Sequence, residues 1–233
     1  SKVVTTATSG SLTVTSHATN GSSYYYKVAT IGTVAGYDSG QSSAYATLKT
    51  TVTDPTAPST LSTPTNVAPS STHNLTWSGA AAGTNNAIST YEIHRSTDGG
   101  ATYSLLTTDS ASPLAVTAPS SNGGTYTYKV KTVGARSSSG LSSAYATMTT
   151  TVGAPSVPTA VSVTNGTDVA PGKTRTLSWS GAANGTNNAI KGYHVYRSVN
   201  GGAYAYLAEV LTTATSGSLG VTAASTAAIY TYK

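Results

Sequence analysis

The chain of 233 residues contains 16 tyrosines but no phenylalanine and no cysteine, so we expect no disulfide, no thiol chemistry and no Cys-containing metal site. Its 12 basic and 7 acidic residues give a net charge of +5, but they are scattered, and without a basic run we expect no nucleic acid as partner. No apolar run approaches the roughly 20 residues of a transmembrane helix, which argues against membrane insertion.

The N-terminal stretch, residues 1–52, is predicted to carry three β-strands. It is rich in Ser, Thr, Gly and Ala, with Val and Tyr at alternate positions, which is typical of half-buried strands joined by polar turns. The stretch contains no tryptophan, and three strands are few for a self-contained sandwich.

Residues 53–152 contain seven strand-like runs in succession. The runs lie near Leu61 and at residues 75–77, 91–95, 103–106, 114–117, 126–133 and 144–151. Seven short alternating strands separated by turn residues predict an antiparallel β-sandwich.

Residues 153–233 repeat this pattern as far as its sixth strand. Trp77 and Trp179 lie 102 residues apart, and each is followed by the motif Gly-Thr-Asn-Asn-Ala-Ile. The next predicted strands open with Tyr91 and Tyr193. A Tyr-x-Tyr-Lys strand occurs three times, at residues 24–27, 126–129 and 230–233. A period near 100 residues is too long for a solenoid and predicts a string of whole domains.

Two proline-containing segments mark the predicted borders. They are Asp54–Pro58 and Gly153–Pro158, and proline stiffens a chain and cannot donate to a β-ladder. We therefore predict the C-terminal part of one domain at 1–52, a complete domain at 53–152, and a domain lacking its last strand at 153–233. Because residues 1–12 resemble residues 208–219, we expect the chain to be a window on a longer array.

The order and spacing of these positions resemble those of fibronectin type III domains. The shared features are Trp on the second strand, Tyr at the start of the third, and Tyr-x-Tyr-x-Val on the sixth. The resemblance covers the whole chain and implies tandem antiparallel sandwiches of an all-β fold. It also implies core anchors at Trp77, Trp179, Tyr91, Tyr193, Tyr26 and Tyr128. The Ser/Thr/Gly-rich composition of the repeats is similar to that of modules in bacterial surface proteins, secreted polysaccharide hydrolases and phage tail proteins.

The Asn-rich loops after the second strands are the most distinctive polar feature. A sandwich places this loop at the same pole as the loop after the sixth strand, where such folds often carry recognition. Amides beside an Arg or a Tyr suit sugar hydroxyls. The candidate recognition residues are Thr84, Asn85, Asn86, Asn187, Asn188, Arg136 and Tyr37. Alternatively, Asn and Gly serve turn geometry, or the identical loops make a packing contact between successive domains.

A second candidate surface alternates with the predicted core positions of the sixth strand. Its members, predicted to face outward, are Tyr25, Lys27, Thr127, Lys129 and Lys131. Such a face suits polysaccharide or an acidic surface, or it is simply solvated, with lysines that discourage edge pairing.

Nothing in the sequence predicts catalysis. The four histidines do not recur at equivalent positions, and no pair of the seven acids suggests general acid–base chemistry. Nucleophile, phosphate-binding and dinucleotide-binding motifs are missing from the sequence. We therefore expect no enzymatic activity, no cofactor and no metal site.

The sequence thus predicts a non-catalytic structural or adhesive array, extracellular or on a virion surface, in a phage tail or fibre or a bacterial surface protein. Its expected partners are other copies or domains of the same assembly, with cell-surface polysaccharide as a weak multivalent ligand. Two alternatives stay open: accessory spacer domains of a secreted glycoside hydrolase, and a self-assembling extracellular filament subunit.

Overall fold

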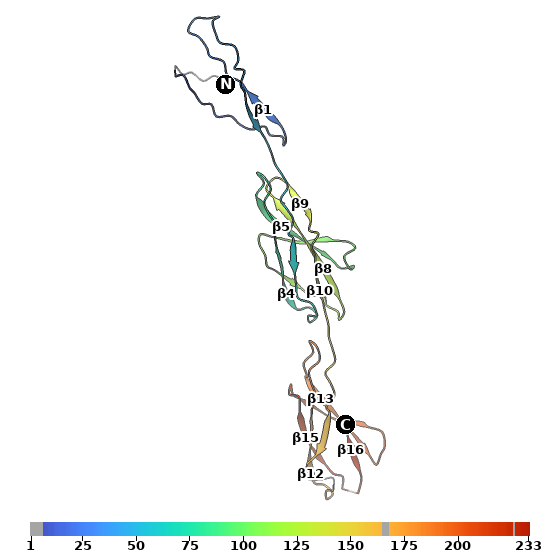
Figure 1. Ribbon diagram of the computed structural model, residues 1–233. Coiled ribbons are helices and arrows are strands. Elements are labelled where there is room, and N and C mark those ends of the chain that lie inside the picture. The colour runs from blue at the N-terminus through green and yellow to red at the C-terminus, as the bar shows by residue number, and fades with distance from the viewer. Residues whose placement is uncertain (1–6, 165–167, 226) are drawn as a thin grey trace. The chain divides into compact units, whose positions relative to one another are not determined.

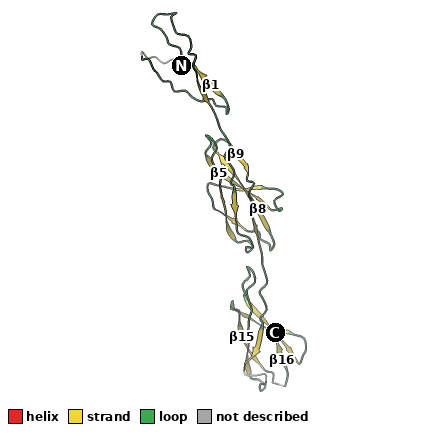
Figure 2. Ribbon diagram, viewed as in Figure 1, coloured by secondary structure: helices red, strands yellow, loops and turns green. Residues whose placement is uncertain are grey.

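The computed structural model describes residues 7–164, 168–225 and 227–233 of the chain (Figure 1). The regular structure of these residues consists of β-strands (Figure 2). No helix in the described part is long and apolar enough to span a bilayer. The strand registers are antiparallel, with one isolated parallel bridge between Val67 and Thr150. The predicted all-β, antiparallel fold class is confirmed.

The chain divides into two compact units, each made of several segments. The first comprises Ser1–Ser62, Leu75–Leu114 and Thr127–Ala146, and the second comprises Thr63–Asn74, Ala115–Tyr126 and Thr147–Lys233. This division runs through residues 53–152, so domain borders after residues 52 and 152 stay a prediction. We call residues 7–52 the first stretch, 53–152 the middle repeat and 153–233 the last repeat.

The first stretch forms one two-stranded sheet. β1 (Ser23–Tyr26) pairs with β2 (Ala46–Lys49), with Ser23 opposite Lys49. The third predicted strand is not formed within residues 7–52: a strand needs a partner ladder, and Leu12 and Val14 lie exposed outside any sheet.

The middle repeat contains two sheets. One has the order β3-β4-β7, and the other has the order β10-β8-β5-β6, with β9 also paired to β8. Their bounds are β3 (Thr60–Ser62), β4 (Thr72–Ser78), β5 (Ile88–Ser96), β6 (Ser104–Asp109), β7 (Leu114–Thr117), β8 (Thr125–Gly134), β9 (Ser138–Leu141) and β10 (Ala146–Thr149). The short strand β9 comes in addition to the seven that the sequence predicts.

The last repeat has two three-stranded sheets, ordered β11-β12-β15 and β14-β13-β16. Their bounds are β11 (Ala160–Val163), β12 (Thr174–Ser180), β13 (Gly192–Val199), β14 (Ala205–Leu211), β15 (Gly217–Thr222) and β16 (Tyr230–Tyr232).

Strict alternation on β4 and β12 builds the cores. Leu75 and Trp77 are buried while their neighbours Thr76 and Ser78 are exposed. Leu177 and Trp179 are likewise buried, with Ser178 half-buried and Ser180 exposed. This is the period-2 signature of a strand with one face against a core.

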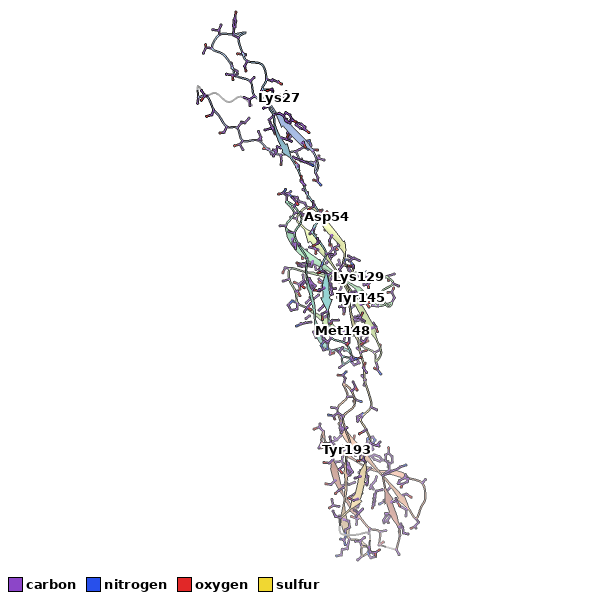
Figure 3. All side chains as sticks on the ribbon, viewed as in Figure 1. Lys27, Asp54, Lys129, Tyr145, Met148 and Tyr193 are labelled. Carbon is purple, nitrogen blue, oxygen red and sulfur yellow. The ribbon has the colours of Figure 1, made fainter. Side chains whose placement is uncertain are left out.

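Tryptophan–tyrosine contacts join the two sheets of each repeat. The ring centroids of Trp77 and Tyr91 lie 5.5 Å apart, and those of Trp179 and Tyr193 lie 5.2 Å apart, both edge to face. Tyr193, labelled in Figure 3, is one of the partly buried side chains that pack against the core cluster of Leu177, Trp179, Val195 and Val221. Such aromatic pairs stabilise a core by about 0.5–1.5 kcal/mol beyond their area burial.

The remaining predicted core anchors differ in burial. Tyr128 on β8 is fully buried, whereas Tyr26 on β1 is only half-buried. The difference follows the number of neighbours, because β8 lies between β10 and β5, while β1 has a single partner strand.

Candidate functional site: the Asn-rich loops and the linkers

Each Asn-rich loop is a tight turn closed by backbone hydrogen bonds. The amide of Gly83 donates to the carbonyl of Asn86 at 3.0 Å, and the return bond measures 3.2 Å. Asn85 within this turn has φ = 51°, and Asn187 in the last repeat has φ = 49°. Asn tolerates this left-handed backbone better than most residues, so turn geometry accounts for one Asn of each pair.

The side chains of the first loop bind the preceding linker, by which we mean residues 51–53. Asn85 Nδ2 donates to the carbonyl of Thr51 at 2.9 Å, and Asn86 Nδ2 donates to the carbonyl of Thr53 at 3.0 Å. The backbones of Thr53 and Thr84 add a bond of 3.2 Å, and Thr53 Oγ1 accepts from the Thr84 amide at 2.7 Å.

The second loop binds the second linker, residues 151–153, in the same way. Asn187 Nδ2 donates to the carbonyl of Thr151 at 2.9 Å, and Asn188 Nδ2 donates to the carbonyl of Gly153 at 3.1 Å. The Gly153 amide donates to the carbonyl of Thr186 at 2.9 Å. Asn187 Nδ2 also reaches the carbonyl of Asn66 at 2.9 Å. The amides of the second Asn-Asn loop are therefore bonded to the linker backbone.

A second Asn holds the middle residue of each linker. Asn20 donates to the carbonyl of Val52 at 2.9 Å and accepts from its amide at 2.7 Å. Asn122 repeats both bonds with Val152, at 3.3 and 2.8 Å. Sequence reasoning missed this pair, although an Asn-Gly step just before each Tyr-rich strand was a usable signal.

We call the hydrogen bonds from the Asn side chains and the Asn-rich loops to a linker the linker clamp. Each clamp binds all three residues of its linker. Asn20 or Asn122 binds the central Val, and the following Asn-rich loop binds the residue on either side of it. The Asn side chains bond linker backbone atoms, so the linker residues themselves can differ, as Thr53 and Gly153 do. Thr53 Oγ1 adds one bond, from the Thr84 amide, that Gly153 has no side chain to make. Linker backbone groups that would otherwise face water thereby gain partners within the protein.

Close approach of the linker requires glycine in each loop. A Cβ on Gly83 would lie 2.0 Å from the carbonyl oxygen of Thr53, and a Cβ on Gly185 would lie 2.0 Å from that of Gly153. Neither distance is compatible with a side chain. The glycines of the Gly-Thr-Asn-Asn motif are thus explained by the linker rather than by an external ligand.

Arg136 lies at the first Asn-rich loop, as expected for a residue in the loop after the sixth predicted strand, at the same pole of the sandwich. The Arg136 amide donates to Asn86 Oδ1 at 2.9 Å, and Arg136 Nε donates to the carbonyl of Asn85 at 2.8 Å. Asn86 Nδ2 further reaches Ser137 Oγ at 2.9 Å, and Asn86 is 2% exposed. The amides that were candidates for sugar recognition are therefore occupied by the chain itself.

Tyr37 is not brought to such a loop. It lies in the first stretch with 81% of its surface exposed. Its amide donates to the carbonyl of Val34, and Asp38 Oδ1 accepts from the amide of Gly32, so local turns hold this loop.

The outward face of β8 differs from its prediction. Thr127 is buried, with 6% of its surface exposed, although alternation assigns it to the outward face. Lys131 Nζ lies 3.2 Å from a carboxylate oxygen of Glu92, and Lys129 Nζ lies 5.1 Å from the centre of the Tyr103 ring. Figure 3 labels Lys129 in the middle repeat. Neighbouring strands thus cover positions that alternation alone assigns to solvent.

No family model matches the chain, and no curated protein matches it. Among solved structures it is similar to FN3tt, at 24% identity over 43% of this chain and 97% of that chain, with a TM-score of 0.34. It is also similar to the FN1–FN3 domains of chicken CNTN1, at 18% identity over 90% of this chain and 68% of that chain, with a TM-score of 0.34. A β-1,2-glucanase from Parabacteroides distasonis matches at 22% identity over 43% of this chain and 13% of that chain, with a TM-score of 0.32.

Proposed function

We propose that the chain is a non-catalytic spacer array, of the kind carried by a phage virion or a bacterial surface protein, whose linkers are held by the clamp. The observation that carries the proposal is the repetition of the clamp. The clamping Asn residues of the two clamps lie 102 residues apart, whereas the two linkers lie 100 residues apart. The same linker backbone groups are nevertheless bonded in both clamps.

A spacer has to resist bending at its linkers, and the clamp supplies that resistance. A free three-residue linker would lose roughly 1–2 kcal/mol of conformational entropy per residue on being fixed. Several hydrogen bonds of about 1 kcal/mol each offset this cost. The Ser/Thr/Gly-rich repeats that suggest a surface or virion location support the same proposal, and the occupied loop amides favour a spacing role over binding by these loops.

Pairs of spin labels across the second linker test the proposal. The chain has no cysteine, so Ser143→Cys and Thr213→Cys, both at exposed positions, give two unique labels. We expect a narrow distance distribution in the otherwise unaltered chain. Combining Asn122→Ala with Asn187→Ala should broaden it, because the backbone of Val152 and the carbonyl of Thr151 then lose the Asn side chains that bind them.

A matched control uses Asn184→Ala, whose Oδ1 accepts from the Ile190 amide within the loop and makes no linker bond. This variant should leave the distribution narrow. A distribution that is already broad before any Asn is removed would contradict the spacer proposal.

A further inference from the structure

The outer face of the β14-β13-β16 sheet carries an aromatic cluster that the spacer role does not use. The Tyr206 ring lies 6.1 Å from that of Tyr196 and 5.7 Å from that of His194, at interplanar angles of 81° and 87°. Lys233 Nζ lies 4.1 Å from the centre of the Tyr204 ring. We call these five residues the tyrosine patch.

Strand pairing fixes the tyrosine patch. Tyr196 on β13 lies opposite Tyr206 on β14, and Tyr204 lies just before β14, two residues from Tyr206. Tyr196 and Lys233 exchange backbone hydrogen bonds of 2.9 and 3.1 Å. Side chains two residues apart on a strand, or directly opposite across a pair, share one face. The patch is therefore a surface built on paired backbone.

The tyrosine patch is exposed and retains polar groups. Tyr206 is 58% exposed and Tyr204 is 39% exposed. In the described part of the chain, no hydrogen bond occupies the hydroxyls of Tyr196, Tyr204 and Tyr206. A cluster of aromatic faces with available hydroxyls suits a ligand that is itself apolar on its faces and polar at its edges.

The ionisable side chains of the patch have partners within the chain. His194 Nε2 lies 3.5 Å from a carboxylate oxygen of Glu209, and the Lys233 ammonium sits over the Tyr204 ring. A ligand that relied on a strong charge would have to compete with these contacts. The surface therefore favours a neutral ligand.

We propose that the tyrosine patch binds a neutral polysaccharide of β-linked glucose-type pyranose rings. In such rings the hydroxyls are equatorial, so both ring faces present C–H groups, and these pack on the negative faces of aromatic rings. The ring-edge hydroxyls would meet the phenol groups and the His194–Glu209 pair. This binding is independent of the linker clamp, so the spacer proposal does not depend on it.

The middle repeat supplies a built-in control. At the positions of His194, Tyr196 and Tyr206 it carries Glu92, His94 and Leu105, by strand register. Glu92 there binds both His94 and Lys131, at 3.2 Å each, and these hydrogen bonds lower the pKa of Glu92. The lysine–tyrosine contact is kept, as Lys129 over Tyr103. A hydrogen-bonded cluster of Glu92, His94 and Lys131 thus replaces the aromatic cluster on the same strands.

Titration of the full chain with cellohexaose, followed by NMR of ¹³C-labelled tyrosine, tests this proposal. We expect the signals of Tyr196, Tyr204 and Tyr206 to shift together, with a Kd of about 1 mM, which is about −4 kcal/mol. Signals of Tyr103 and Tyr145 in the middle repeat should stay in place. Sorbitol at equal hydroxyl concentration, which has hydroxyls but no ring faces, should produce no such shifts.

The double variant Tyr196→His and Tyr206→Leu installs residues that the middle repeat already carries at these positions. It should lower the affinity at least tenfold while the indole signal of Trp179 stays unchanged. Undiminished binding by this variant, or no shift at the solubility limit of the sugar, would overturn the proposal. Shifts of the patch signals with protein concentration alone would assign the patch to a second copy of the chain instead, and would also overturn it.

Discussion

The middle and last repeats are alike where each repeat supports its own fold and its linker, and they differ on an outer sheet face. Both pair a buried Trp with a Tyr at 5.2–5.5 Å, and both bind the preceding linker through an Asn-Asn loop. On the outer face, Glu92, His94 and Leu105 of one repeat stand where the other has His194, Tyr196 and Tyr206. Core and linker are thus the common frame, and the outer face is free to vary.

The largest expected effect comes from breaking the common core. Trp77→Ala should destabilise the middle repeat by about 3–5 kcal/mol, because a buried indole leaves a cavity beside Tyr91. Hydrogen exchange of the Ile93 amide measures the loss. Trp179 remains as the lone fluorescent Trp and should report an unchanged last repeat. A loss below about 1 kcal/mol would contradict the assigned core role.

The close approach of loop and linker can be broken with one methyl group. Gly185→Ala should cost roughly 1–3 kcal/mol through steric displacement of the Gly153 carbonyl. The measurement is the exchange rate of the Gly153 amide. Gly140→Ala is the matched control, because a Cβ there meets no atom within 4 Å, and it should leave the rate unchanged. Equal behaviour of the two variants would argue against a steric contact at Gly185.

Burial sharpens the comparison between the two loops. Asn86 is 2% exposed and bonded to Ser137 and Arg136, whereas Asn188 is exposed. Asn86→Ala should therefore cost about 1–3 kcal/mol, since it leaves buried groups without partners, and Asn188→Ala should cost less than about 1 kcal/mol. Urea denaturation of the two variants measures the two losses in the free energy of unfolding. A larger loss for Asn188→Ala would contradict the link between burial of the Asn side chain and its contribution to stability.

The smallest expected effect concerns the turn after β5. Asp98 accepts hydrogen bonds from the Ser96 hydroxyl and from the side chain and amide of Thr102. The bond from Ser96 has the largest effect, and together these bonds lower the pKa of Asp98 from its ordinary value of 3.8. The carboxylate therefore stabilises the fold above pH 3.8, and this contribution is lost as the pH falls below 3.8 toward the lower pKa of the folded state.

The last repeat carries Asn200 at this position. Asp98→Asn should accordingly remove the acid-dependent loss of protection at the Thr102 amide, measured as the exchange rate relative to an unstructured peptide at the same pH, without affecting the last repeat. An acid dependence that persists in the variant would assign it to another group.

The sequence predicts those features whose residue types are distinctive and recur in both repeats. Trp77 and Trp179 recur at a fixed spacing within alternating strands, so their buried positions follow from period and hydrophobicity. The Asn-Asn turns were equally visible, because the identical motif follows both tryptophans. The sequence does not reveal what these amides bind, because their acceptors are backbone carbonyls of a linker more than 30 residues away.

Other features depend on neighbours that a single strand does not reveal. Alternation assigns Thr127 to the outer face of β8, but it cannot say that surrounding side chains cover it. Asn122 and Val152 are 30 residues apart and meet only once the sheets have formed. The tyrosine patch likewise requires the register of β13, β14 and Lys233, which no periodicity fixes.

Hydrogen exchange at the two clamped linker amides, Thr53 and Gly153, tests the central claim most directly. Each donates to the backbone of an Asn-rich loop, Thr53 to Thr84 and Gly153 to Thr186. We predict exchange far slower than in an unstructured linker. We also predict acceleration at Gly153 when Asn188 is replaced by Ala and no change when Asn184 is. Exchange at the rate of an unstructured peptide in the unaltered chain would contradict the clamp.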